Sequence, residues 1–163
     1  MKNEVTFREI CKGEEAEACR LVIECFNGFV APDYSDEGVK EFLKYINPDS
    51  MQRRLVNGDF VLVALDGDLL IGIIEVCSNN HVALFFVNKR FQRRGIARRL
   101  LELAIRKCRE VEKEVNEIDV NSSPYAVEIY EKLGFVRVDA EQLVNGIRFI
   151  PMKLKLSGVA PRG

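Results

Sequence analysis

The sequence predicts an α/β (α+β) domain built on one mixed β-sheet of about six to seven strands, with four helices on its faces. The length of 163 residues fits a single domain, for which roughly 100–200 residues are typical. Hydrophobic residues make up 47% and charged residues 30% of the chain, and both values are ordinary for a globular protein. The apolar pattern changes period in the order strand, two helices, three strands, helix, strand, helix, two strands.

The N-terminal third of the chain predicts a strand followed by helices. From Glu14 to Phe29 the apolar residues recur at i, i+3, i+4 and i+7, which is the spacing of one helix face. Ser35 or Asp36 is expected to cap a second helix that runs through Tyr45. The expected strand covers residues 4–10, and a further turn or two of helix covers residues 49–56.

The rest of the chain predicts strands interrupted by two helices. Asp66-Gly67-Asp68 is short enough to join two apolar runs as a hairpin. The most regular helix carries its apolar stripe from Ala97 to Cys108. Pro124 suits the first turn of a shorter helix and Gly134 suits its end. The expected strands lie at residues 60–65, 69–77, 81–87, 117–121, 135–139 and 147–155.

Composition excludes several classes of protein. The 24 basic and 25 acidic residues leave a net charge of −1, which argues against a surface built to hold nucleic acid or an anionic membrane. No apolar stretch approaches the roughly 20 residues that cross a bilayer, and the charged first ten residues do not resemble a signal peptide. We therefore expect a cytoplasmic monomer or homodimer, with one domain at residues 1–156 and a disordered tail at 157–163.

The five cysteines are expected to be reduced and structural. Their number is odd, they contain no CxxC pair, and three of them fall among apolar helical positions. Because the chain has one histidine, we expect no metal site.

The segment FFVNKRFQRRGIARRLL carries the strongest indication of function. A buried strand ends at Val87, and residues 92–97 then open the long helix. A helix N-terminus presents unpaired N–H groups and a positive dipole end, which together bind phosphate. Gly95 lets the backbone approach an anion closely. The basic residues clustered here are Lys89, Arg90, Arg93, Arg94, Arg98 and Arg99. A solvated helix start is the alternative, although cations are slightly unfavourable at this end of a helix.

A second indication lies in VNSSPYAVEIYEKLGF, residues 120–135. Tyr130 is expected on a short helix that follows a strand. A phenol can donate a proton to a thiolate leaving group, which is general-acid chemistry. The alternative is an ordinary core tyrosine with its hydroxyl at the surface.

These two motifs resemble those of the GNAT N-acetyltransferases. QRRGIA at residues 92–97 is similar to the acyl-CoA pyrophosphate loop of that family, Q/R-x-x-G-x-G/A, and YEKLGF at 130–135 is similar to its terminal signature. The order of elements from 4 to 155 also matches the family. The last two segments, NSSPYAVEIYEKLGF and NGIRFIPM, resemble a branch of small, unassigned prokaryotic acetyltransferases.

The resemblance implies acetyl-CoA as cosubstrate and Tyr130 as general acid beside its sulfur. Ser123 stands where the family often has Asn, and Ala97 replaces the more frequent second glycine. The residues that the resemblance assigns to acetyl-CoA, through a strand backbone and the helix opening, are Phe85, Phe86, Val87, Gln92, Arg93, Arg94, Gly95, Ile96, Ala97, Arg98 and Ser123.

The base that deprotonates the acceptor is less defined. Many relatives carry a glutamate on the central strand, but the matching run here, VALFFV, has no acid. Glu75 is the best replacement, because a carboxylate inside an apolar strand is costly unless it faces a cleft or is paired. Its alternative is a surface residue at a sheet edge. Asp119, His81 acting through water, or a chain of waters remain candidates.

The expected function is transfer of an acetyl group from acetyl-CoA to a primary amine of a small molecule or peptide, by direct attack in a ternary complex. An acyl-carrying Cys77 or Cys108 is the mechanistic rival, although neither has a neighbouring histidine. A non-catalytic acyl-CoA-binding sensor or regulatory module is the alternative function.

Acidic residues near residue 35 offer a site for a cationic amine, but a helix cap with solvated acids explains them more simply. Nucleic acid binding is not expected, because only Phe91 accompanies the basic cluster.

Overall fold

The computed structural model describes residues 4–156, so the predicted tail at 157–163 lies outside the described residues. It contains one mixed sheet in the order β1-β2-β3-β4-β5-β8-β6, with β7 paired to β8. The strands are β1 (Val5–Glu9), β2 (Phe60–Asp66), β3 (Leu69–Cys77), β4 (His81–Val87), β5 (Glu117–Ser122), β6 (Val136–Arg137), β7 (Gln142–Val144) and β8 (Ile147–Lys155). The mixed α/β class is confirmed, and β7 is a strand that the sequence pattern did not reveal.

Five α-helices and four short helical segments complete the described part of the chain. The α-helices are α1 (Glu15–Cys25), α2 (Asp36–Tyr45), α3 (Pro48–Val56), α4 (Ile96–Val111) and α5 (Val127–Lys132). The short segments are the π-helix η1 (Phe26–Val30) and the 3-10 helices η2 (Ala31–Asp33), η3 (Lys89–Phe91) and η4 (Pro124–Ala126). Within residues 4–156, no helix combines the length and the apolar character that crossing a membrane requires.

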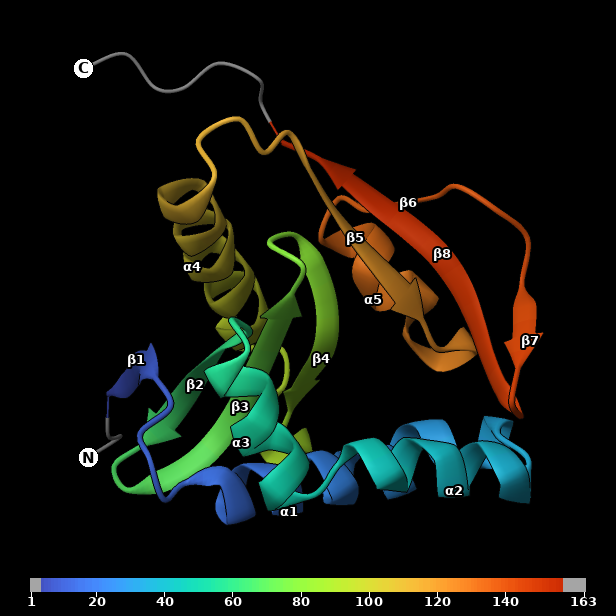
Figure 1. The fold of residues 1–163 in the computed structure, drawn as a ribbon, viewed down its shortest axis with the longest axis horizontal. Helices are drawn as coiled ribbons and strands as arrows, with labels where there is room; N and C mark the ends of the chain where they lie inside the picture. Colours follow the sequence, from blue (N-terminus) through green and yellow to red (C-terminus); the bar gives the residue numbers. More distant parts are fainter. Residues whose placement is uncertain (1–3, 157–163) are drawn as a thin grey trace.

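The sheet consists of two halves joined by a short seam. Strands β1 to β4 are antiparallel neighbours, and β5 is antiparallel to β8. The seam is the parallel pairing of β4 with β5, which contains only His81↔Asp119 and Val82↔Val120. Beyond Val82 the two strands diverge, and the halves of the sheet separate (Figure 1). The edge of β4 that faces β5 is therefore left without a strand partner.

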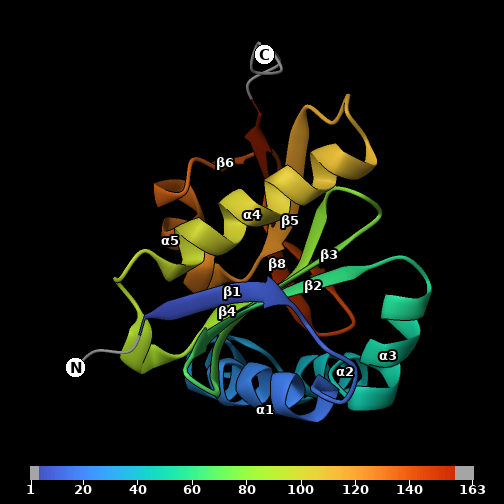
Figure 2. The same cartoon turned by 90° about the vertical axis from the view of Figure 1, so that its left-hand side faces the viewer.

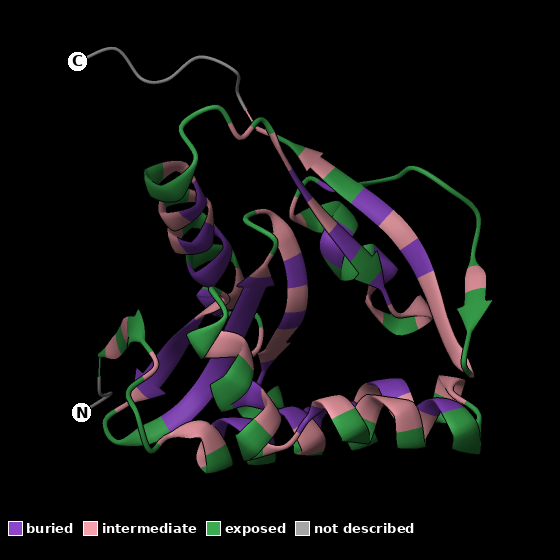
Figure 3. Ribbon diagram, viewed as in Figure 1, coloured by how far each residue is buried: buried purple, intermediate pink, exposed green. Residues whose placement is uncertain are grey.

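Helices cover both faces of the first half of the sheet. Helix α4 lies on one face, and α1, α2 and α3 lie on the other (Figure 2). Strand β3 shows the consequence, because Ile71 and Ile74 pack in the core beneath α4 whereas Ile73 packs in the core beneath α1. Both faces of β2 and β3 are buried (Figure 3), which explains why their sequences are continuously apolar rather than alternating.

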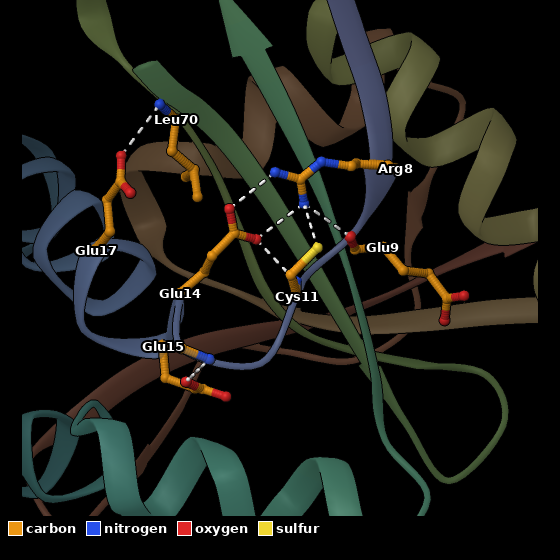
Figure 4. A network of polar contacts seen from close by, with 8 residues as sticks. Arg8, Glu9, Cys11, Glu14, Glu15, Glu17 and Leu70 are labelled. Carbon is orange, nitrogen blue, oxygen red and sulfur yellow. Dashed lines mark hydrogen bonds and ion pairs between the residues drawn. The ribbon is translucent and has the colours of Figure 1, made fainter. Parts of the chain in front are cut away.

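An ion pair fixes the entry of the chain into α1. Arg8 on β1 binds both carboxylate oxygens of Glu14 at 2.8 Å, and the Cys11 backbone N–H donates to the same carboxylate at 2.8 Å (Figure 4). Glu17, in the first turn of the helix, accepts a hydrogen bond from the Leu70 N–H at 3.4 Å. These contacts attach the start of the helix to two strands of the first half.

The segments α1, η1, η2 and α2, here called the helical arm, cross the open side of the fork between β4 and β5 (Figure 1). Ser35 caps α2 by accepting a hydrogen bond from the Gly38 N–H at 3.2 Å, which decides between the two predicted caps. Gly38 then packs on the β7–β8 turn so closely that a Cβ atom there would lie 2.1 Å from the Gly146 carbonyl oxygen. The arm thus touches both halves of the sheet.

Candidate active site

A cavity of about 470 Å³ lies at the fork between the two halves of the sheet. Its walls come from the helical arm, from β4 and the start of α4, and from β5, η4 and α5. A concave site of this size, placed where strands diverge, is typical of a small-molecule site.

The N-terminus of α4 opens onto one end of this cavity. Gly95 is the N-cap residue in a left-handed conformation, with φ of 78°, and no atom lies within 4 Å of where its Cβ would be. Arg93 also has a positive φ, 65°, which is uncommon for a residue with a side chain. The predicted loop residues that line the cavity are Gln92, Arg93, Gly95, Ile96, Ala97 and Arg98. The free N–H groups of the first helical turn therefore face open space large enough for an anion.

Arg94 is the one member of the predicted loop that does not line the cavity. Its guanidinium lies over the Phe91 ring, 5.1 Å from the ring centroid. Arg93, Arg98 and Lys132 supply the positive charge at the cavity, and Arg98 donates to the Lys132 carbonyl at 3.1 Å. This end of the cavity has the donors and the charge that a pyrophosphate requires.

The unpaired edge of β4 forms the wall in the middle of the cavity. Phe85, Phe86 and Val87 all line it, and they pair only with β3. The Val87 carbonyl already accepts hydrogen bonds from Gln92 Nε2 at 3.2 Å and from the Cys25 thiol at 3.6 Å. Backbone groups alternate between the two edges of a strand, and the Asn88 N–H donates to Ile71 on β3, so Phe86 also bonds to β3. The backbone groups of Phe85 therefore remain the ones that an extended ligand can use.

Tyr130 lies on the opposite wall. Its side chain is almost fully buried, and its ring packs edge-on against Phe85 and Phe135 at centroid distances of 6.0 and 5.2 Å. Burial raises the pKa of Tyr130, so its hydroxyl keeps its proton at any physiological pH. Ser123 also lines the cavity, while its hydroxyl accepts a hydrogen bond from the Ala126 N–H at 3.3 Å as the cap of η4.

Asn121 lines the cavity and was not predicted from the sequence. It alternates with Ile118, Val120 and Ser122, which face the core. Its polar side chain at an outward position of this alternating strand is the sequence feature that could have identified it.

The structure does not place Glu75 at the cavity. Its side chain is completely buried, and Arg54 on α3 binds its two carboxylate oxygens at 2.7 and 3.1 Å. The Tyr45 hydroxyl donates to the same carboxylate at 3.4 Å. The alternative of a surface residue at a sheet edge is also wrong. The buried carboxylate is tolerated because Arg54 pairs with it. Arg54 lies on α3, a segment distant in sequence from Glu75.

The other two candidate bases lie together. His81 and Asp119 are opposite each other at the seam, and Nδ1 of His81 contacts a carboxylate oxygen of Asp119. Cys77 is the partner of His81 across β3 and β4, so the expectation that it lacks a neighbouring histidine is wrong. Burial nevertheless raises the pKa of the Cys77 thiol, and Asp59 raises it further. Cys77 is therefore not activated as a thiolate.

All five cysteines are free thiols. Cys25 lines the cavity, but burial raises its pKa to about 11. Burial raises the pKa of Cys108 to about 11 as well. The described residues contain no group of three or more His, Cys, Asp or Glu side chains placed to hold a metal ion.

A helix N-terminus, an unpaired strand edge and a buried phenol thus line one cavity in a mixed α/β fold. The model of the acetyltransferase (GNAT) domain matches residues 30–156. The chain belongs to the GNAT acetyltransferase family.

Solved structures share this fold at low sequence identity. A GCN5-related N-acetyltransferase from Rhodopseudomonas palustris superposes with a TM-score of 0.79 at 18% identity, over 96% of this chain and 98% of that one. The PaiA N-acetyltransferase of Thermoplasma acidophilum, crystallised with coenzyme A, gives 0.77 at 19% identity, over 93% and 99%. N-acetylglutamate synthase of Neisseria gonorrhoeae gives 0.70 at 14% identity, over 96% of this chain and 36% of that one. No curated protein matches the sequence.

Proposed function

We propose that this protein transfers the acetyl group of acetyl-CoA to a primary amine of a small molecule or peptide, by direct attack within a ternary complex. One observation carries the proposal. A single cavity is lined by the N-terminus of α4, by the unpaired edge of β4 and by the buried phenol of Tyr130. Coenzyme A in the Thermoplasma structure supports acetyl-CoA as the donor.

The residues at the cavity fit this donor. The N–H groups at residues 95–98 and the cations Arg93, Arg98 and Lys132 bind the pyrophosphate. The free backbone groups of Phe85 on β4 hold the pantetheine arm, and the side chain of Phe86 lines the cavity beside it. Bound acetyl-CoA supplies an activated thioester carbonyl, and the residues around it orient that group toward the acceptor.

Tyr130 acts as the proton donor to the departing sulfur. Its hydroxyl is protonated because burial raises its pKa, and no hydrogen bond within residues 4–156 occupies it. The surrounding rings of Phe85 and Phe135 keep this position apolar. A donor held in this way contributes at the step in which negative charge develops on sulfur.

We assign the removal of the amine proton to the pair of His81 and Asp119, acting through water. Asp119 and Asn121 are alternate residues of β5, so their side chains lie on one face about 7 Å apart, and Asn121 lines the cavity. Glu75 is a weaker candidate, because its charge is already neutralised by Arg54 inside the first half of the sheet.

Direct attack is favoured over an acyl-cysteine route. Burial keeps Cys25 and Cys108 protonated by raising the pKa of each to about 11, and it raises the pKa of Cys77 too. The attacking group is therefore the amine itself.

The test is an assay of free thiol released from acetyl-CoA, with and without amines, together with calorimetry of acetyl-CoA binding. We expect binding and saturable, amine-dependent thiol release. Acetyl-CoA that binds without any amine-dependent release would contradict the proposal and favour a non-catalytic sensor.

A further inference from the structure

The end of the cavity away from α4 is lined by aromatic rings. The helical arm contributes Phe29, Tyr34 and Phe42, β4 contributes Phe86, and η4 contributes Tyr125. Phe42 meets Phe86 edge-on at a centroid distance of 6.4 Å. Phe29 stacks on Tyr125 at 5.1 Å and so connects the arm to the second half of the sheet. These five side chains form what we call the aromatic end.

The aromatic end holds no counter-ion for an additional positive charge. No aspartate or glutamate is among the described residues that line the cavity, and its cations Arg93, Arg98 and Lys132 come from the opposite end. Burial raises the pKa of Tyr34 to about 12, so this phenol is neutral as well. Nor does the aromatic end hold a cation that would pair with a carboxylate of the acceptor.

The acidic residues near residue 35 do not change this. Asp36 and Glu37 are exposed in the first turn of α2, and neither lines the cavity. Asp33 stays outside the lining as well, and its backbone carbonyl accepts from Arg148 at 3.4 Å. The structure thus favours solvated acids at a helix start over a site for a cationic amine.

We infer that the acceptor is a monoamine whose amino group is attached to an aromatic or branched apolar group. This inference rests on the proposed acetyl transfer. Aromatic faces accept one ammonium group through cation–π attraction and bury an apolar body favourably. A polyamine or aminoglycoside would bring further ammonium groups into an end with no carboxylate, and each would lose hydration without a partner. An α-amino acid would bring a carboxylate with no cation beside it.

The experiment compares acceptors at saturating acetyl-CoA. The probes are 2-phenylethylamine and tryptamine as aromatic monoamines, spermidine and kanamycin as polycations, and phenylalanine as an aromatic amine with a carboxylate. We expect kcat/KM for the aromatic monoamines to exceed that for the other three by about 100-fold. A higher kcat/KM for spermidine or kanamycin would overturn the inference.

Two variants test the missing counter-ion directly. Phe29→Asp and Tyr125→Asp each place one carboxylate at the aromatic end, and Tyr125 is already 40% exposed, so its replacement disturbs packing little. Leu143→Asp adds the same charge on β7 outside the cavity and is the matched control, since Leu143 is 68% exposed. We expect either cavity variant to move the ratio of kcat/KM toward spermidine by about two- to fivefold, the preference that one partly exposed ion pair provides. An unchanged ratio in both would overturn the inference.

A binding measurement separates this inference from the proposed function. Calorimetry follows 2-phenylethylamine and spermidine added to protein saturated with coenzyme A. Binding of 2-phenylethylamine but not spermidine, with no thiol release in the assay, would contradict acetyl transfer and support the aromatic end as a site for an aromatic amine. Thiol release with spermidine preferred would support acetyl transfer and contradict the aromatic acceptor.

Discussion

At the scale of single residues, Tyr130 decides whether the cavity is catalytic. Tyr130→Phe keeps the ring between Phe85 and Phe135 and removes only the proton donor. We expect kcat to fall by about 10²–10⁴, with little change in the affinity for acetyl-CoA, because a ground-state contact with sulfur is weak. Tyr45→Phe is the matched control, since Tyr45 lies at the Glu75 pair and outside the cavity. A kcat equal to that of the wild type would assign Tyr130 to packing.

Gly95 is the residue on which the anion site depends. Gly95→Val would fill the open space above the start of α4 and would require a φ of 78° from a β-branched residue. Gly58 provides the comparison, because it also has a positive φ, 109°, with no atom within 4 Å of its Cβ position, and it does not line the cavity.

We expect Gly95→Val and Gly58→Val to lower stability by similar amounts, about 1–2 kcal/mol each. Only Gly95→Val should weaken acetyl-CoA binding, by at least about tenfold, in calorimetry. Equal affinity in the two folded variants would remove the anion site from the start of α4.

Asp59 makes stability depend on pH. Burial, followed by the hydrogen bond with Glu75 and its charge, raises the pKa of Asp59 to about 6, although Arg54 opposes the shift. A carboxyl with a raised folded-state pKa binds more protons in the folded than in the unfolded state between pH 4 and 6. Stability therefore falls as pH rises through this window.

Asp59→Asn removes this penalty and retains a hydrogen-bond donor for Glu75. We expect the variant to be more stable than the wild type at pH 8 by about 1 kcal/mol, after allowance for solvent screening at a partly exposed group. The difference should shrink below pH 4 in chemical denaturation. The exposed Asp68→Asn controls for the lost charge. A difference that is constant with pH would show that Asp59 does not titrate in this window.

At the scale of elements, the start of α4 separates two neighbouring arginines. Arg93 lines the cavity, whereas Arg94 lies over Phe91. We expect Arg93→Gln to weaken acetyl-CoA binding about three- to tenfold, close to 1 kcal/mol, and less so at high salt. Arg94→Gln should have a smaller effect, although it removes the same charge one residue away. Equal losses would mean that general charge, rather than position, binds the phosphates.

Elements with local determinants were predictable from the sequence, and those that depend on distant contacts were not. Ser35 caps α2 through its side chain, Pro124 begins η4 and Gly134 follows α5 with a positive φ, so each marks a helix end by a local property. Strand β7 was missed because it has three residues and exists only through pairing with β8. The π-helix η1 continues α1 where an ordinary helix was expected.

In the candidate site too, the residues with local sequence motifs were predictable and those that depend on distant contacts were not. The loop before α4 and Tyr130 are carried by short motifs, so their place at one cavity follows from the order of elements. Two other features depend on segments far apart in the chain: the pairing of Glu75 with Arg54, and the aromatic end. No local sequence pattern predicts either of them.

At the scale of the whole molecule, the helical arm must reach the second half of the sheet. Gly38→Ala would place its Cβ against backbone of the β7–β8 turn, which cannot move as a flexible side chain would. We expect a loss of about 1–3 kcal/mol in chemical denaturation and a raised KM for the acceptor. Gly28→Ala, which meets nothing within 4 Å, is the control. A Gly38→Ala protein as stable as wild type would mean that the arm does not depend on this contact.

The short seam between β4 and β5 has a consequence for how the chain assembles. Strands β1 to β4 come from residues 5–87 and strands β5 to β8 from residues 117–155, so the strand pairs inside each half do not depend on the other half. The halves are joined by two ladder pairs, by the Phe29–Tyr125 stack and by the arm on the β7–β8 turn. A ligand that lies in the fork contacts both halves and binds only the joined form. Its binding therefore stabilises the joined form relative to one in which the halves are apart. We therefore expect the stability of the joined form to rise with the concentration of acetyl-CoA relative to its dissociation constant.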